Sequence, residues 1–344
     1  LPSEKGIVQN VIYEDFNDNT LGTKQIVKVK LLTGEFKGQT TELENALTGN
    51  PYYDIKLKKN SRVILHAEDN GNGVEYSIED IQRSNTLIWL SLLFCGLLIY
   101  VGKKKGIYSL ISIALTILLI TNCMSPLILL GLNPVIICLF VCVISTAITM
   151  YFVGGFNAKS TSASFGAILS LIFAGILSGL TILTAQLTGF AGENSLFLYS
   201  THPELNFVAI TVSTMVLATL GAVMDVAMSI SSTINEIYLT DNTKTVKELF
   251  ISGMNVGRDI IGTMANTLIL VYMGGSLPLI LLAGNVDWQK FINLNQVVTE
   301  VSSALIGSIA IVICVPFTAL VASGMIHKYA KKAESENIEN ALKI

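Results

Sequence analysis

The chain has 344 residues, of which 51% are apolar and only 14% are charged. Soluble domains carry about 25% charged residues, so this composition and a mean hydropathy of +0.60 indicate that much of the chain lies in lipid. The net charge of −3 is too small to suggest nucleic acid as a partner.

Residues 1–83 differ from the rest of the chain and predict a small all-β domain. Residues 26–31 alternate apolar and charged side chains, which is the period of a half-buried strand. Residues 61–78 have the pattern of two strands, with turn residues at Asp69–Gly73 between them. We expect a β-barrel or sandwich of the OB or SH3 kind, without catalytic chemistry.

From about Asn85 onward the sequence predicts seven transmembrane helices. A span needs roughly 20 predominantly apolar residues, and stretches of about that length recur along the chain. They are 86–102, 107–130, 134–153, 162–187, 206–238, 256–283 and 296–327. The predicted fold is an α-helical polytopic membrane protein with an N-terminal β-domain at 1–83, a seven-helix domain at 84–330 and a tail at 331–344.

The basic residues predict the orientation of these helices. Lys103, Lys104 and Lys105 follow the first apolar stretch, and alternation of the spans places most later lysines on the same side. Basic loops mark the cytoplasmic side. We therefore expect the β-domain outside and the C-terminus in the cytoplasm. An outside domain must be translocated, so we expect a signal or a membrane segment before Leu1 in the native chain.

A line of polar side chains runs along the apolar stretch 206–238. Its acidic and hydroxyl members are Asp225, Ser229, Ser232 and Glu236. Their spacing of four, three and four residues places them on one helical face, which small or hydroxyl residues continue toward the helix start. These are Gly221, Ala218, Thr214 and Thr211. We expect this face to contact protein or a water-filled path rather than lipid.

Asp225 is the first candidate for a functional group. At 1.5 Å per residue it lies about 16 Å deeper than Glu236, near the midplane of a hydrocarbon core about 30 Å thick. A charged Asp there costs about 2.5–3.5 kcal/mol, and such residues are functional candidates by default. The alternative is a protonated Asp that only donates a hydrogen bond between helices.

A matching set of residues occurs at the start of the next apolar stretch. Its members are Asn255, Asp259, Gly262 and Asn266. Asn266 lies at a depth comparable with Asp225, so we predict a hydrogen-bonded pair across two antiparallel helices. Thr263 and Thr267 are candidates to join this pair.

Further candidates lie nearer the two membrane surfaces. Arg258 and Asp259 lie near the predicted cytoplasmic mouth, where interfacial anchoring and a gating role remain open. Glu300 lies near the outer end of the last apolar stretch, where it is either a site residue or simply solvated.

The chain resembles one family closely. The segments MDVAMSISSTINEI, GRDIIGTMANTLIL and LIGSIAIVICVPFTALVAS, with most of residues 1–330, resemble the YibE/F family of bacterial multi-spanning membrane proteins. The resemblance implies an extracytoplasmic β-domain followed by helices in the bacterial cytoplasmic membrane. It implies no assigned activity.

A remote resemblance concerns residues 206–330. The Asp225 segment and the following helix resemble the central helices of the SecD and SecF export subunits and their resistance–nodulation–division relatives. The resemblance implies that Asp225 carries a proton, that Asn266 and Thr267 form the facing polar patch, and that Glu236 ends the helix. The Arg usual near that helix end is absent here, and the large extracytoplasmic domain is replaced by a small barrel.

These observations favour a transport protein in which Asp225 binds a proton or Na⁺, supported by Asn266, Thr267, Thr263, Ser229 and Ser232. A passive channel or permease remains open, as does an envelope scaffold that binds a partner through the β-domain. Beyond the lipid bilayer, the candidate partners are a second copy of the chain or an extracytoplasmic protein.

No sequence pattern indicates an enzyme, a nucleotide site or a bound metal. The cysteines fall in or beside apolar segments, and the histidines are scattered. The stretch 153–161 is not a phosphate loop, because Val153 and Ala158 stand where its two glycines are needed. We expect no cofactor other than a coupling H⁺ or Na⁺.

Overall fold

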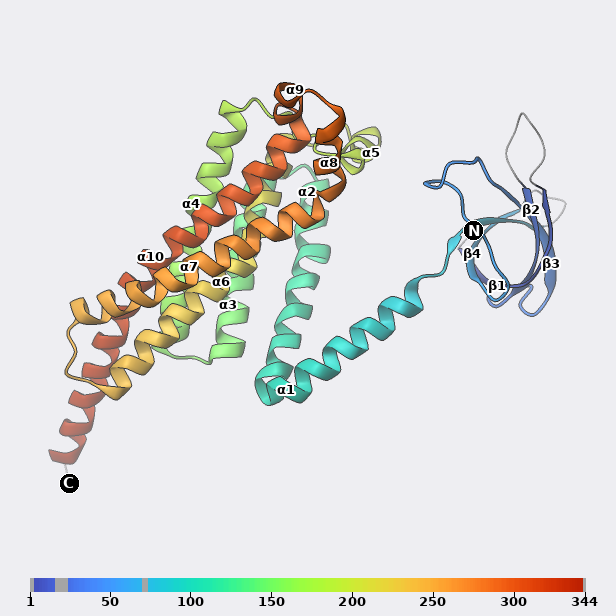
Figure 1. Cartoon of the computed structure of the whole chain (residues 1–344). Coiled ribbons are helices and arrows are strands. Elements are labelled where there is room, and N and C mark those ends of the chain that lie inside the picture. The colour runs from blue at the N-terminus through green and yellow to red at the C-terminus, as the bar shows by residue number, and fades with distance from the viewer. Residues whose placement is uncertain (1–2, 16–23, 70–73, 343–344) are drawn as a thin grey trace. The chain divides into compact units, whose positions relative to one another are not determined.

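The computed structural model describes residues 3–15, 24–69 and 74–342 (Figure 1). The chain divides into two compact units, Leu1–Leu97 and Leu98–Ile344. The first contains the β-domain, and the second contains most of the helices.

The N-terminal unit holds a nearly closed five-stranded barrel, which confirms the predicted all-β domain. Its strands are β1 (Glu4–Asp15), β2 (Lys24–Leu31), β3 (Thr40–Ala46), β4 (Arg62–Asp69) and β5 (Val74–Ile81). They pair antiparallel in the order β3-β2-β1-β4-β5, and the two edge strands approach each other. Most of the predicted Asp69–Gly73 turn, residues 70–73, lies outside the described residues.

The alternation in β2 explains how this barrel acquires a core. Val27, Val29 and Leu31 are buried, whereas Lys28 and Lys30 between them are exposed. Successive side chains of a strand point to opposite faces, so the apolar set lines the interior. Other fully buried members of this core are Val8, Val63 and Leu65.

The rest of the chain is almost entirely helical. The helices are α1 (Ser84–Leu119), α2 (Ser125–Leu129), α3 (Pro134–Gly154), α4 (Ala158–Thr184), α5 (Glu193–Thr201), α6 (Phe207–Thr240), α7 (Val246–Gly275), α8 (Leu277–Leu282), α9 (Trp288–Ile292) and α10 (Asn295–Leu342). A π-helical turn at Ile120–Met124 joins α1 to α2, and a 3₁₀ turn at Ala283–Asn285 follows α8.

Short polar residues set the start of the long helices. The side chains of Asn133, Asn157 and Asn206 each accept a hydrogen bond from a backbone N–H in the first turn that follows. Thr245 does so for α7, and Glu248 completes a capping box there. These caps satisfy N–H groups that have no partner within a helix, so each apolar run begins at a defined residue.

Among the described residues, five helices are long and apolar enough to cross a membrane, or six if the bent pair of α7 with the segment from Leu277 to Asn285 forms one span. One of the five, Ser84–Leu129, includes a kink at Lys103, where φ is 50° and ψ is −130°. The kink separates the two apolar stretches that the sequence distinguishes there. The number of seven spans stays a prediction.

Two predicted helical segments take a different course in the structure. The sixth begins at Val246 and bends by 68° after Gly275. Pro278 lies in the first turn of α8. Proline has no backbone N–H, so it cannot continue the backbone hydrogen bonds of α7. In contrast, α10 passes Pro316 without ending, and the predicted tail from residue 331 continues this helix to Leu342.

The helical unit buries small polar side chains within a largely apolar core and exposes large apolar side chains. Buried hydroxyls link helices, as in the 2.7 Å bond between Ser162 of α4 and Ser231 of α6. Large apolar side chains such as Phe140, Phe165 and Ile176 are exposed. This pattern suits a protein surrounded by lipid, because close packing and interhelical hydrogen bonds hold such helices together. The apolar helices therefore support a membrane-embedded protein.

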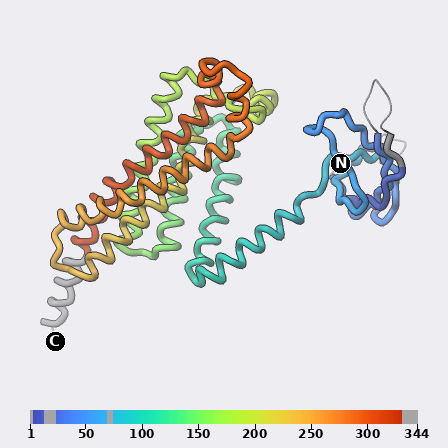
Figure 2. Tube along the Cα trace, in the orientation of Figure 1, coloured from blue at the N-terminus to red at the C-terminus, as the bar shows by residue number. Residues whose placement is uncertain are grey.

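Four long helices form the centre of this unit. α4, α6, α7 and α10 run alongside one another, and α3 packs against α4 and α6 (Figure 2). A methyl group on Gly166 of α4 would stand 2.8 Å from the Cα of Thr318 of α10. Only a glycine lets the two backbones approach this closely.

Candidate functional site

The polar line on α6 lies on the face that the rest of the described chain leaves uncovered. Asp225, Ser229 and Glu236 are exposed, and Ser232 is half-buried. The opposite face of the helix carries fully buried apolar side chains, including Val223, Val226, Ile230 and Ile234. Toward the helix start, Gly221, Ala218 and Thr214 continue the exposed line.

Thr211 departs from this line. The sequence places it on the polar face, but the structure buries it, with its hydroxyl donating to the backbone oxygens of Gly189 and Phe207. The exposed polar face therefore extends from Thr214 to Glu236.

The matching residues on α7 also face outward. Asn255, Asp259, Gly262 and Asn266 are all exposed, as are Thr263 and Thr267. The buried face of α7 includes Gly253, Gly257 and Leu268. Gly257 packs against Val315 of α10, so α10 lies behind the polar face of α7. Both polar lines therefore lie on outer faces of the packed helices.

Two contacts fix the register between α6 and α7. A methyl group on Gly253 of α7 would stand 2.6 Å from Ile234 of α6. One on Gly307 of α10 would stand 2.5 Å from Leu268 of α7 and 2.9 Å from Thr219 of α6. Ile234 is thus level with Gly253, and Thr219 is level with Leu268. Counting along the two antiparallel helices from these pairs places Asp225 level with Gly262 and Gly221 level with Asn266. Asp225 and Asn266 thus differ in depth by one helical turn, about 6 Å.

In the described part of the chain, no hydrogen bond or ion pair engages the Asp225 carboxyl. The hydroxyls near it donate within their own helices: Ser229 to the backbone oxygen of Asp225 at 2.7 Å, and Thr267 to that of Thr263 at 2.9 Å. Thr263 likewise donates to Ile260 at 3.0 Å. These hydroxyl protons are engaged, so their oxygens remain as acceptors for a donor or a cation.

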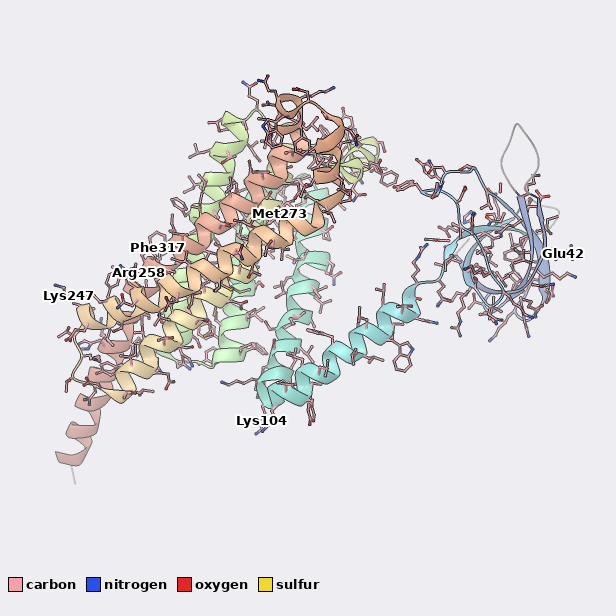
Figure 3. The ribbon with its side chains drawn as sticks, in the orientation of Figure 1. Glu42, Lys104, Lys247, Arg258, Met273 and Phe317 are labelled. Atoms are coloured by element: carbon pink, nitrogen blue, oxygen red, sulfur yellow. The ribbon has the colours of Figure 1, made fainter. Side chains whose placement is uncertain are left out.

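The residues at the predicted cytoplasmic mouth do not form one cluster. Arg258 donates to the side chain of Asn255 at 3.0 Å, and among the described residues neither Arg258 nor Asp259 makes an ion pair. Lys247, Arg258 and Met273 mark successive levels along α7 (Figure 3). Glu236 borders an open hollow of about 270 Å³ near the end of α6, together with Thr233, Thr240 and Lys244.

A larger cavity, of about 310 Å³, lies at the other end of the polar line. Thr214 and Ala218 of α6 line it, and Glu300 of α10 and Tyr272 of α7 face it. Glu300, which the sequence places at the outer end, thus borders a cavity that also touches the line leading to Asp225. The polar line on α6 has a hollow at each end, with Asp225 between them.

Family comparisons agree with the architecture. The model for the YibE/F-like protein matches residues 90–328, and the model for the YibE/F family N-terminal domain matches residues 6–81. The chain belongs to the YibE/F family. No curated protein and no solved structure matches it. The likeness of residues 206–330 to the SecD and SecF helices therefore stays a prediction.

Sequence reasoning missed one polar group of this YibE/F protein. Tyr272 lies six residues past Asn266, off the spacing of the α7 line, and a tyrosine near a helix end is usually an interfacial anchor. In the described part of the chain its buried hydroxyl oxygen has no hydrogen-bond partner. Only the packing of α5, α6, α7 and α10 around the cavity of about 310 Å³ makes this group visible.

Proposed function

We propose that this YibE/F protein is a membrane transporter in which Asp225 takes up and releases a cation, H⁺ or Na⁺. The observation that carries the proposal is the exposed polar line on α6, which has a cavity at each end and Asp225 between them. Coupling to an ion by alternating access needs an ion-binding group that can be reached in turn from each side of the membrane.

The uncovered position of the line supports a wet path or a protein partner rather than lipid. A polar or charged group facing acyl chains is expensive, and such groups normally face a bundle interior or a water-filled cavity. On α7, Gly262 lies level with Asp225 and Asn266 lies level with Gly221. Among the described residues, a methyl group on Gly221 or Gly262 would have no atom within 4 Å, which leaves room beside these polar side chains for water or an ion.

The available oxygens support a cation as the transported or coupling species. The Ser229 and Thr267 hydroxyls have engaged protons and free acceptor positions, as described above, and the Asn266 amide adds a carbonyl oxygen. Carboxylate, hydroxyl and amide oxygens suit a hard cation, and a carboxylate alone suffices for a proton. We propose that α6 and α7 shift along each other to bring Asn266 to the level of Asp225.

A current measurement on proteoliposomes tests the proposal. A pH jump or a Na⁺ jump should evoke a transient current with the wild type and none with Asp225→Asn, while Asp225→Glu retains part of it. Glu204→Gln, which changes an exposed carboxylate outside the line, is the matched control. A normal current from a folded Asp225→Asn variant would remove the proposal.

The orientation belongs to the same proposal. We place the barrel outside the bacterial cytoplasmic membrane and the end of α10 in the cytoplasm. The lysines at 103–105, after the first apolar stretch, and Lys244 and Lys247, just before α7 and in its first turn, support this placement through the positive-inside rule.

One observation favours a second candidate function, binding of an envelope protein through the barrel. Tyr52 and Tyr53 on the segment between β3 and β4 are 73% and 69% exposed, and exposed aromatic residues are frequent anchors at interfaces. Under this alternative a Tyr52→Ala, Tyr53→Ala double variant loses function in cells and Asp225→Asn does not. The transporter predicts the reverse.

A further inference from the structure

The larger cavity, at the Thr214 end of the α6 polar line, has a lining that suits one class of ligand. It is called the outer cavity, after the proposed orientation. Among the described residues, the carboxylate of Glu300 borders it and no Lys, Arg or His side chain does. Within the same residues no ion pair neutralises Glu300. A negative group without a counter-ion in a partly enclosed site attracts a positive ligand.

Several other polar side chains of the cavity offer acceptor oxygens. The hydroxyls of Thr214 and Ser303 donate to the backbone of their own helices, at 3.0 and 2.7 Å, as does that of Thr299 at 2.7 Å. Their free lone pairs therefore accept hydrogen bonds from a ligand. The Tyr272 hydroxyl, buried and without a partner, is a further group that a ligand would satisfy.

The size and the apolar part of the lining favour an organic cation over a bare metal ion. The volume of about 310 Å³ lies at the lower end of the range of small-molecule sites, roughly 300–1,000 Å³. Leu198, Phe207, Ile210 and Met215 supply apolar walls. A bare ion needs a close shell of oxygens, whereas this cavity pairs one charged wall with several apolar ones.

We infer that the outer cavity binds a small organic ammonium ion, with Glu300 as its counter-ion and its apolar body against the Phe207 side. The ammonium donates to Glu300 and to the hydroxyl oxygens of Thr214 and Ser303, and the Tyr272 hydroxyl completes the polar wall. The inference rests on the proposed transport function in one respect: it names the substrate class of that transporter. The binding itself does not depend on transport.

Binding to the purified full-length protein in detergent tests the inference. The probes are phenethylammonium, its uncharged analogue 2-phenylethanol and Na⁺, measured by calorimetry at neutral pH. We expect phenethylammonium to bind the wild type and 2-phenylethanol to bind at least about tenfold more weakly, because the alcohol forms no ion pair. Na⁺ in large excess should displace little of the amine.

Variants locate the site. Glu300→Gln keeps the shape of the side chain and removes its charge, so we expect a loss of about tenfold or more in amine affinity with little change for the alcohol. Tyr272→Phe should weaken amine binding by less. Glu204→Gln, a carboxylate outside the cavity, should leave amine binding unchanged, and thermal unfolding of each variant shows that it is folded.

Asp225→Asn separates this inference from the transport proposal. The variant should bind phenethylammonium like the wild type, because Asp225 does not line the cavity. Amine binding without any gradient-driven current in the wild type would remove the transport proposal and keep the binding site. Equal amine affinity in the wild type and Glu300→Gln, or equal affinity for the amine and the alcohol, would overturn the inference.

Discussion

Asp225 on α6 and Asn266 on α7 lie one helical turn apart in depth, and within the described residues no hydrogen bond joins them. Each stands level with a glycine of the other helix, Gly262 and Gly221 respectively. The two polar lines are therefore aligned side by side, while their polar groups are staggered. A shift of α6 along α7 by one turn would bring the carboxyl and the amide to one level.

Cross-linking tests this register. In a background without the five native cysteines, the pair Gly221→Cys with Asn266→Cys should react efficiently with a short bifunctional thiol reagent, since the two positions are level. The pair Thr214→Cys with Gly262→Cys spans about 16 Å along the helix axis and should not. Efficient reaction of the second pair alone would show that the register is wrong. Mass spectrometry of the digested protein identifies each product.

A wet path over α6 predicts that its polar positions react with water-soluble reagents. In the same background, Ser229→Cys should react with a membrane-impermeant charged thiol reagent in proteoliposomes. Ile176→Cys on α4 is the control, because Ile176 is 59% exposed but lies among apolar side chains. Thiols react as thiolates, which need water around them, so a cysteine facing lipid stays unmodified. Equal modification at the two positions would argue against a distinct aqueous path.

Local sequence patterns predicted where the helices and strands lie better than they predicted which helix faces the rest of the chain covers. The alternation at 26–31 correctly gave a half-buried strand, and the spacing around Asp225 placed the α6 residues from Thr214 to Glu236 on one face, although Thr211 is buried. The pattern could not tell whether that face would be covered by another helix of the chain, because both arrangements use the same spacing. In lipid, polarity no longer separates inside from outside: buried serines lie within the largely apolar core of this bundle, and large apolar side chains lie on its surface.

Features that depend on the packing of several helices could not be predicted from the local sequence. Residues of α5, α6, α7 and α10 line the outer cavity, and Tyr272 contributes to it from a position off the α7 polar line. The hydropathy pattern did not predict the bend after Gly275, because the pattern shows one continuous apolar stretch there. The local sequence does indicate a bend, since glycine weakens a helix and proline interrupts it, and the segment contains Gly274, Gly275 and Pro278.

The close approach of α4 and α10 predicts that Gly166→Ala destabilises the helical unit. The new methyl group would meet the backbone of Thr318, which cannot move aside as a flexible side chain could. Overpacking of this kind costs about 1–3 kcal/mol. Gly179→Ala on the same helix is the control, because no atom lies within 4 Å of its added methyl group. Helix propensity favours alanine there by about 1 kcal/mol.

Thermal unfolding in detergent measures this difference, with Gly179→Ala at or above the midpoint of the wild type and Gly166→Ala below it. A midpoint for Gly166→Ala equal to that of the control would mean that α4 and α10 are farther apart than the structure has them.

The loop before β4 predicts a pH-dependent structure in the barrel unit. Asp54 accepts hydrogen bonds from the backbone N–H and hydroxyl of Thr48, at 2.5 and 2.9 Å, and from the backbone N–H of Gly49 at 2.8 Å. Desolvation raises the pKa of Asp54, but these hydrogen bonds outweigh it and hold the pKa below the ordinary value of 3.8. The charged carboxylate therefore stabilises the loop above that ordinary value, and the stabilisation is lost as the pH falls through the lowered pKa.

Amide exchange of Thr48 and Gly49, corrected for the intrinsic rate, should thus show protection at neutral pH that weakens as the pH falls through the lowered pKa of Asp54. Asp54→Asn should lose protection already at neutral pH, since its amide nitrogen cannot accept the second backbone hydrogen bond. The exposed Tyr52 and Tyr53 give an independent readout, because chymotrypsin cleaves after tyrosine and should cut the Asp54→Asn loop faster. Asp80→Asn is the matched control: Asp80 bonds to Ile81 and Arg83, away from this loop. If Asp54→Asn and Asp80→Asn are cut at the same rate, Asp54 does not order the loop.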